Sequence, residues 1–145
     1  MITDVKQSHI AELDQSMRDI DRKEMVLAGY ETLEQYVNSI GYKDSVKHSF
    51  IAPNGNLMGI GGVYNINEKF DNVWILTTWE VEKYPVVFCR DVKKVIAKYE
   101  HPDRIMNNGV HKDNKIVIQW LERLGFELFE PNENNIRGFI KKCVQ

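Results

Sequence analysis

The most regular apolar spacing in the chain lies in its last third. Apolar residues recur there at i, i+3, i+4 and i+7, namely at Val117, Trp120, Leu121 and Leu124. This spacing places them on one face of a helix that begins at Asn114. Gly125 follows the last turn, where a glycine in a left-handed conformation commonly ends a helix. The next residues, "FELF", alternate with period two, so the pattern predicts a helix that passes directly into a strand.

Helical spacing also marks three segments near the N-terminus. A first helix is predicted after Ser8, a good capping residue, with an apolar face at Ile10, Leu13, Met17 and Ile20. Asp21 and Thr32 each have a Glu or Gln three residues later, which is the pattern of a capping box, so each is predicted to start a further helix. Gly41 is predicted to end the third helix.

Strand-like patterns occupy most of the remaining chain. "HSFIA" and "LMGIGGVY" flank the turn "PNGN", in which Asn-Gly indicates a hairpin, and the glycines Gly59, Gly61 and Gly62 indicate a bulge or a close backbone approach. A helix with Pro85 in its first turn is predicted to run to His101. The predicted strands are 1–5, 48–52, 57–64, 73–78, 104–110, 126–130 and 136–144.

The order of these elements predicts an α/β (α+β) domain. Its central sheet is expected to be mixed and mostly antiparallel, with helices on both faces and a parallel step around the helix at 85–99. The sheet is expected to splay at that step, between the strands 73–78 and 104–110, where an open sheet can admit a ligand. No repeat or low-complexity tract divides the chain, so one domain is predicted over 1–145.

Composition narrows the function classes. Apolar residues make up 43% and charged residues 28% of the chain, and the net charge of −2 gives no support for nonspecific nucleic-acid binding. No apolar run is long enough to cross a bilayer, and the polar N-terminus is unlike a signal peptide. Cys89 and Cys143 lack metal-ligand spacing, so neither a metal site nor a disulfide framework is expected.

The order of elements and the stretch from Asn114 to Phe126 resemble the Gcn5-related N-acetyltransferase (GNAT) superfamily. Many of its members carry a helix that begins with Asn, has a small residue three later, Tyr seven later, and Gly-Phe eleven and twelve later. Here those positions hold Asn114, Val117, Leu121, Gly125 and Phe126. The resemblance implies acetyl coenzyme A as cofactor, with Asn114 close to its pantetheine arm.

A phage branch of the superfamily resembles the chain more specifically, namely the internal virion protein A family of short-tailed phages. The shared features are an early "MRDIDRKEM" region, a glycine-rich strand after a short hairpin, a tryptophan-bearing strand, a long helix and the "N…WLERLGF" block. This resemblance implies a protein found in the host cytoplasm or packaged in the virion.

Two family features are missing. GNAT enzymes usually bind pyrophosphate on a glycine-containing loop after the fourth strand, where backbone N–H groups hold the anion. The corresponding residues 77–88 contain no glycine, Pro85 removes one N–H donor, and Glu80 and Glu82 oppose phosphate with Lys83 as the nearby cation. Leu121 stands where the family usually has its general-acid tyrosine.

Acyl transfer to an amine needs a surface that holds the thioester, a base, and a proton donor for the departing thiolate. The candidate catalytic residues are Glu80 and His111 as bases and Tyr84 as donor. The candidate cofactor-binding residues are Leu76, Thr77, Thr78, Lys83 and Asn114. Four of these residues also have a purely structural interpretation. Glu80 and His111 can be ordinary loop residues, Tyr84 a packed ring, and Asn114 a helix cap.

Two functions from different classes follow. The first is a phage-encoded N-acyltransferase that uses acetyl coenzyme A and acts on a small-molecule or protein amine, with an atypical pyrophosphate loop. The second is a non-catalytic GNAT-like phage protein that binds a phage or host protein in virion assembly, ejection or host interference. The missing glycines and tyrosine favour the second, and fold alone does not decide between the two.

Overall fold

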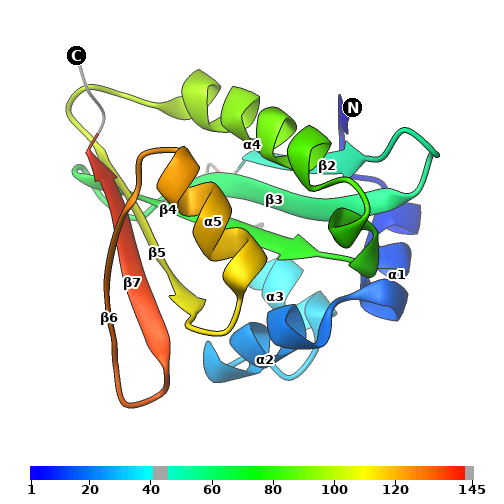
Figure 1. Ribbon diagram of the computed structural model, residues 1–145, viewed down its shortest axis with the longest axis horizontal. Coiled ribbons are helices and arrows are strands. Elements are labelled where there is room, and N and C mark those ends of the chain that lie inside the picture. Colours follow the sequence, from blue (N-terminus) through cyan, green and yellow to red (C-terminus); the bar gives the residue numbers. More distant parts are fainter. Residues whose placement is uncertain (41–45, 143–145) are drawn as a thin grey trace.

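A computed structural model describes residues 1–40 and 46–142, whose strands form one mixed sheet. The strands are β1 (Ile2–Thr3), β2 (Val46–Ile51), β3 (Leu57–Asn65), β4 (Phe70–Thr77), β5 (Ile105–His111), β6 (Glu127–Pro131) and β7 (Ile136–Lys142). The helices are α1 (Gln7–Ser16), α2 (Asp19–Leu27), α3 (Leu33–Ile40), α4 (Pro85–Tyr99) and α5 (Lys115–Arg123), with a 3-10 turn η1 (Trp79–Glu82). The element order predicted from the sequence is confirmed (Figure 1).

The sheet has the strand order β1-β2-β3-β4-β5-β7-β6, and β4 and β5 form its parallel pair. These two strands pair at Phe70–Ile105, Asp71–Met106 and Asn72–Asn107 and then diverge, although β4 continues to Thr77 and β5 to His111. The predicted splay is therefore confirmed. Below, its narrow end is the paired end near Asn72, its middle lies beside Ile75, and its wide end lies between Thr77 and His111.

An ion pair that no sequence pattern indicates links β4 to the residue before β5 at the narrow end. Arg104 donates from Nε to both carboxylate oxygens of Asp71, at 3.0 Å each. β4 consequently begins at Phe70, inside the stretch 65–72 predicted as a polar loop. The prediction missed these residues because Asp71 and Asn72 interrupt any apolar pattern, and their strand structure comes from pairing with β3 on one side and β5 on the other.

Helices cover both faces of the sheet, as predicted (Figure 1). α4 and α5 pack on one face with Val73 and Ile75 of β4, around Phe88 and Trp120. The helices α1, α2 and α3 pack on the other face, on Trp74 and Leu76 of the same strand. Alternate residues of β4 thus belong to two different cores, which is why residues 73–76 are all apolar.

The N-terminal helices differ from the prediction. α1 is capped by Lys6 rather than Ser8 and ends at Ser16, so Met17 and Ile20 do not continue its apolar face. Met17 instead forms an isolated antiparallel bridge with Thr78, and α2 starts at Asp19 rather than Asp21. Helical periodicity runs unbroken through this point, so only a contact with a distant strand explains the break.

Three residues at helix ends or at a close strand contact behave as predicted. Thr32 Oγ1 accepts from the Gln35 N–H at 3.1 Å at the start of α3. Gly125 has φ +89°, the left-handed conformation expected after α5. A Cβ on Gly62 would lie 1.9 Å from the Val46 carbonyl oxygen, which explains a glycine there by close backbone approach. Gly41, which was predicted to end the third helix, and Cys143 lie outside the described residues.

Candidate functional site

The main chain of β4 decides what the splay can bind. Thr78 N–H donates to the Met58 carbonyl of β3 at 2.9 Å, and the Thr77 carbonyl accepts from Arg18 N–H at 3.1 Å on the opposite side. Successive residues of a strand direct their main-chain groups to opposite sides. Every second residue of β4, namely Val73, Ile75 and Thr77, therefore presents its N–H and C=O to the splay.

These exposed main-chain groups are satisfied unequally. The Val73 carbonyl accepts from Asn108 Nδ2 at 2.8 Å near the narrow end. Thr77 bonds to Arg18 through its carbonyl and to Asp21 Oδ1 through its N–H, at 3.3 Å. Ile75 lies between them, beyond the paired residues of β5, and makes no hydrogen bond on this side with any residue that the structure describes. Its peptide groups are free to bind a partner with amide character.

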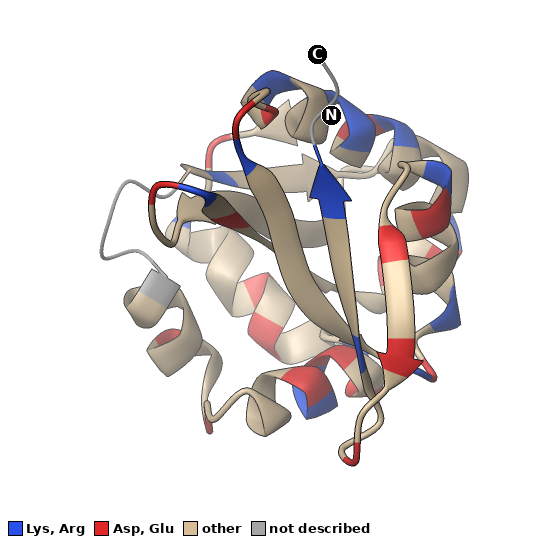
Figure 2. Ribbon diagram, turned by 90° about the vertical axis from the view of Figure 1, so that its left-hand side faces the viewer, with Lys and Arg blue, Asp and Glu red and all other residues tan. Residues whose placement is uncertain are grey.

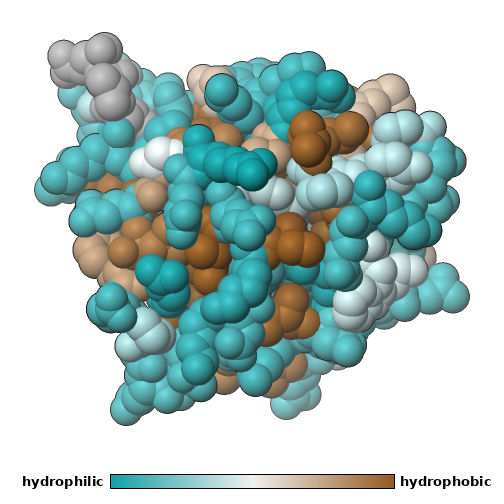
Figure 3. All heavy atoms as spheres, viewed as in Figure 1, coloured by the Kyte–Doolittle hydropathy of each residue, from teal (hydrophilic) through white to brown (hydrophobic). Residues whose placement is uncertain are grey.

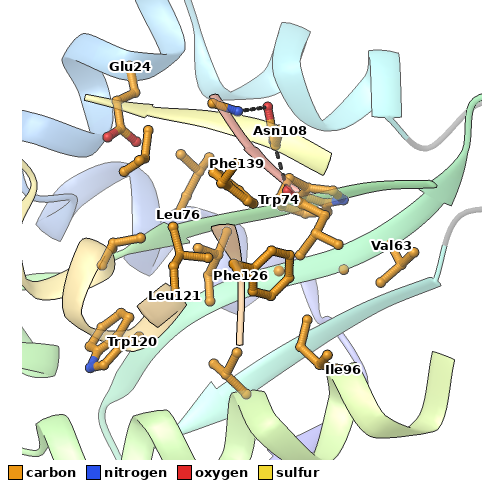
Figure 4. A pocket seen from close by; sticks show the side chains of 18 of the residues that line it. Glu24, Val63, Trp74, Leu76, Ile96, Asn108, Trp120, Leu121, Phe126 and Phe139 are labelled. Carbon is orange, nitrogen blue, oxygen red and sulfur yellow. Dashed lines mark hydrogen bonds between the residues drawn. The ribbon is translucent and has the colours of Figure 1, made fainter. Parts of the chain in front are cut away.

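A cavity of about 120 Å³ adjoins Ile75 and passes between the diverging strands. It is lined by β4 and β5 and by side chains from both helical layers (Figure 4). Glu24 lies at one end in this view, and Ile96 of α4 lies at the other, with Leu121 and Phe126 between them. Apolar side chains also reach the surface in the middle of the face that carries α5, between polar neighbours (Figure 3). The splay is thus an apolar passage with one carboxylate at its end.

The wide end is occupied by a cluster of buried polar side chains. Arg18 donates from Nε to Asp21 Oδ2 at 2.9 Å and to Thr77 Oγ1 at 2.8 Å. Its Nη2 donates to Asn114 Oδ1 at 2.9 Å, and Thr77 Oγ1 donates to Asp21 Oδ2 at 2.7 Å. All four residues are less than 5% exposed. We call Arg18, Asp21, Glu24, Thr77 and Asn114 the polar cluster; its arginine spans the gap from the end of β4 to the start of α5.

Glu24 is the member of the polar cluster that also lines the cavity. Its Oε1 accepts from the His111 N–H at 2.8 Å and from Asn114 Nδ2 at 2.9 Å. Burial raises the pKa of Glu24 to about 7, and the nearby Asp21 charge adds to this rise, against the hydrogen bonds and the Arg18 charge. A carboxylate with this pKa accepts a proton readily near neutral pH.

The structure places the predicted base Glu80 away from the cavity. Glu80 lies in η1 beside a separate polar hollow of about 370 Å³, which Glu12 and Trp79 also line. Asn54 Nδ2 donates to its Oε1 at 2.6 Å, and this hydrogen bond holds the pKa of Glu80 below its usual value. The lowered pKa makes Glu80 a weaker base than Glu24.

The predicted residues Lys83 and Tyr84 lie at the start of α4. Lys83 is exposed, and its Nζ approaches Glu80 Oε2 at 3.5 Å. Tyr84 occupies the N-cap position with its ring half-buried against the α4–α5 core. Neither lines the splay cavity. Their location suits contact with the outer part of a ligand rather than with its reacting group.

His111 contributes its backbone rather than its ring. The side chain is 1% exposed, Nδ1 accepts from the Asp113 N–H at 3.1 Å, and Nε2 has no partner among the described residues. Burial lowers the pKa of His111, with the Lys23 charge adding to the effect. Its main-chain N–H donates to Glu24 Oε1 at 2.8 Å, so the backbone of His111 helps to fix the position of the Glu24 carboxylate.

The cofactor-binding residues predicted on β4 and α5 are buried and largely engaged. Leu76 lines the cavity with its side chain, but the alternation that places Thr77 toward the splay directs the main chain of Leu76 and Thr78 toward β3. Asn114 is the N-cap of α5 by position, yet its side chain makes no capping hydrogen bond. Its amide bonds to Arg18 and Glu24 instead, so the interpretation as a simple helix cap is incomplete.

The residues missed from the sequence are Ile75, Arg18 and Glu24. Ile75 lies one position before the predicted 76–78, and only the Thr78–Met58 hydrogen bond fixes which residues face the splay. Arg18 and Glu24 lie within "MRDIDRKEM", which reads as a solvated helix face because charges alternate along it. The family resemblance of that stretch was the one available signal.

Residues 1–40 and 46–142 contain neither a cluster suited to bind a metal ion nor a helix suited to span a membrane. No group of three or more His, Cys, Asp or Glu side chains is arranged to hold a metal ion there. Within the same residues, no helix combines the length and apolarity needed to span a membrane.

Comparison with known proteins gives the fold a name. No protein-family model matches the chain, and no curated protein sequence matches it. Solved structures do match along nearly the whole length. A GNAT from Kribbella flavida has a TM-score of 0.66 at 15% identity, covering 98% of this chain and 96% of its own. The chain therefore has the fold of the GNAT acetyltransferases, as the sequence predicted.

Two further neighbours were solved with ligands. A phosphinothricin acetyltransferase from Sinorhizobium meliloti, in complex with acetyl coenzyme A, has a TM-score of 0.68 at 12% identity, covering 99% of this chain and 88% of its own. Spermidine N-acetyltransferase from Vibrio cholerae, in complex with coenzyme A and spermine, has a TM-score of 0.63 at 12% identity, covering 99% and 95%. At these identities the likeness concerns the fold.

Proposed function

We propose that this protein is an N-acyltransferase that transfers an acyl group from a coenzyme A thioester to an amine. The observation that carries the proposal is the unpaired peptide edge of Ile75 beside the splay cavity. The pantetheine arm of coenzyme A contains two amides, which can pair with such an edge as an added strand does. Neighbours of the same fold that bind coenzyme A support this choice.

The chemistry of the transfer assigns a role to Glu24. The amine nitrogen attacks the thioester carbonyl, so a C–N bond forms, the C–S bond breaks, and the amine must lose a proton. The Glu24 carboxylate at the end of the cavity accepts that proton. With its pKa of about 7, it can pass the proton to the departing thiolate, whose thiol has a pKa of roughly 8.5. A separate tyrosine at position 121 is then unnecessary.

The start of α4 offers few groups that could bind the phosphates of the coenzyme. Pro85 occupies the first turn of α4, leaving the amides of Val86 and Val87 as donors at that helix end. Four of the five charged residues of α4 are basic, and basic segments gather near the top of the ribbon in Figure 2. The first of the four in chain order is Arg90, which lies more than one turn beyond the start of the helix. Lys83 is therefore the nearby cation, and its partner Glu80 offsets its charge. We expect most of the affinity to come from the pantetheine arm.

The acceptor is proposed to be a small-molecule or protein amine, as the chemistry requires a nucleophilic nitrogen. The resemblance to the internal virion protein A family supports a phage origin. The site of action would then be the host cytoplasm or the virion.

A second function is favoured by the polar cluster. Arg18 joins Thr77 to Asn114 across the wide end of the splay, so the protein's own residues fill the space through which an arm would pass along β4. A non-catalytic phage protein that has kept the GNAT fold for binding a phage or host protein needs no such passage. In the enzyme, by contrast, the arm must enter beside this cluster or displace Arg18.

Calorimetric titration with acetyl coenzyme A at low and high ionic strength separates the two functions. The enzyme is expected to bind weakly, with little loss in salt because phosphate contacts are few. Asn114→Leu should weaken binding more than Lys83→Ala, with thermal melts used to exclude unfolded protein. If no binding is detected at millimolar coenzyme, the non-catalytic function is favoured. Tight, strongly salt-dependent binding would show that phosphate donors lie elsewhere in the chain.

A further inference from the structure

The cavity in the splay is larger than an acetyl group requires. A single water needs roughly 10–15 Å³ by the same measure, and the methyl of an acetyl group is of comparable size. The volume of about 120 Å³ exceeds this several-fold. A thioester carbonyl near Ile75, with its methyl group in the cavity, would leave most of the space empty.

Most residues that line the cavity belong to the core on the α4 side of the sheet. Beyond β4 the wall is formed by Val95 and Ile96 of α4, by Leu121 of α5, and by Phe126 and Phe139 (Figure 4). All five residues are buried, and their hydrocarbon side chains carry no hydrogen-bond donor or acceptor. Water has no partners there, and cavities of this kind stay dry and bind apolar groups.

Tyr36 and Trp74 also line the cavity, but both belong to the core on the opposite face of the sheet, so their polar atoms do not alter this conclusion. The Asn108 side chain is already bonded to the Val73 carbonyl and to Gly109 N–H. Glu24 lies at the opposite end from Ile96 (Figure 4). The cavity is thus polar where the proton must be taken and apolar beyond the thioester, which is the arrangement that an acyl chain with a reactive head needs.

We propose that the α4 side of the cavity holds the hydrocarbon tail of the acyl group, and that the thioester used carries an unbranched chain of roughly four to eight carbons rather than acetyl. This inference rests on the proposed acyltransferase function. The transfer itself is unchanged: the C–N bond replaces the C–S bond, and the proton passes through Glu24 to the thiolate. Each added methylene should strengthen binding about fourfold until the cavity is full.

The first experiment tests the cavity without any coenzyme. Xenon binding, followed by ¹²⁹Xe NMR, is expected for the wild type and should be lost in Val95→Phe, which fills the α4 side. Ala97→Phe is the control, since it introduces the same side chain on the same helix at an exposed residue that does not line the cavity. Absence of xenon binding in the wild type would overturn the inference. If Val95→Phe fails to fold by circular dichroism, Val95→Leu replaces it.

The second experiment measures the affinity of acetyl, butanoyl, hexanoyl and octanoyl coenzyme A by calorimetry. The wild type and Ala97→Phe should show the rise of about fourfold per methylene, whereas Val95→Phe should keep its acetyl coenzyme A affinity and lose the rise. A flat series with acetyl coenzyme A bound would overturn the tail pocket and leave the acyltransferase intact. No binding of any member would overturn the proposed function, and the inference with it.

Discussion

The middle and the wide end of the splay are bounded by the same two strands, yet they solve the same problem in opposite ways. Parting β4 from β5 exposes main-chain groups that must find partners. At the wide end, Arg18 and Asp21 bond to Thr77 and close the gap. In the middle, Ile75 receives no such partner from residues 1–40 and 46–142, and it faces an apolar cavity. The wide end is therefore closed by the protein's own groups, and the middle is where the proposed ligand would bind.

Glu24 lies on the border between these two regions. Its Oε1 belongs to the hydrogen-bond network of the wide end, while its side chain lines the cavity of the middle. A group that must bind a proton transiently needs both a fixed position and access to the reacting atoms. The contrast between the two regions therefore gives Glu24 a place where both conditions are met.

Removing Arg18 should break the wide end and has the largest expected effect. Arg18→Ala leaves Asp21 buried and without its counter-ion, which should lower the free energy of unfolding by about 3–5 kcal/mol in urea denaturation. Arg22→Ala is the control on the same helix, because its ion pair with Asp14 is exposed and should contribute about 0–1 kcal/mol. Equal, small losses in both variants would show that the polar cluster does not hold the splay.

The pH dependence of stability tests whether Glu24, between the wide end and the middle of the splay, has a raised pKa. Because the folded pKa of about 7 lies above the usual value of 4.5, the stability that this group contributes is full below pH 4.5 and is lost as pH rises through 7. The stability of the wild type relative to Glu24→Gln should therefore fall by up to about 3 kcal/mol between pH 4 and pH 8. Urea unfolding at several pH values measures this difference.

Glu34→Gln, on the exposed side of α3, provides the reference for that titration. Its stability difference from the wild type should stay level across the same range. A level difference for Glu24→Gln as well would place Glu24 in an ordinary solvated environment and remove its role as the base.

Enlarging a side chain tests the middle and has the smallest expected effect. Val95 lines the cavity, whereas Val81 is fully buried in the same core without lining it. Val95→Leu should change the unfolding free energy by less than about 1 kcal/mol, while Val81→Leu should cost about 1–3 kcal/mol by overpacking. Thermal melts of both variants make the comparison. Similar costs at the two positions would mean that the cavity is closed in solution.

The sequence predicted the strands and the helix that surround this site better than the side chains within it. The order of elements requires a parallel step around α4, and the parting of β4 and β5 at that step followed from it. The start of α5 at Asn114 was also correct by position. These features depend on local periodicity and on the connection rules of sheets, which a sequence carries directly.

The polar cluster could not be predicted in the same way. Arg18 and Asp21 have the spacing of ordinary charged residues on a helix surface, and their burial depends on partners far along the chain. The break at Met17 likewise arises from pairing with Thr78, although the apolar periodicity continues through it. Local patterns show which residues form a helix, but not which distant groups will cover its charged side.

The hydrogen bonds of Arg18 also constrain the order of folding during synthesis. They join residues separated by 59 positions at Thr77 and by 96 at Asn114. The loops closed by such contacts are long relative to the chain, and non-local contacts slow folding because the entropy of closure is lost before the contacts form. As a chain emerges from the ribosome, α1 and α2 must therefore wait with Arg18 and Asp21 solvated until β4 and the start of α5 have been made. We expect the splay to acquire its wide-end closure as one of the last events in folding.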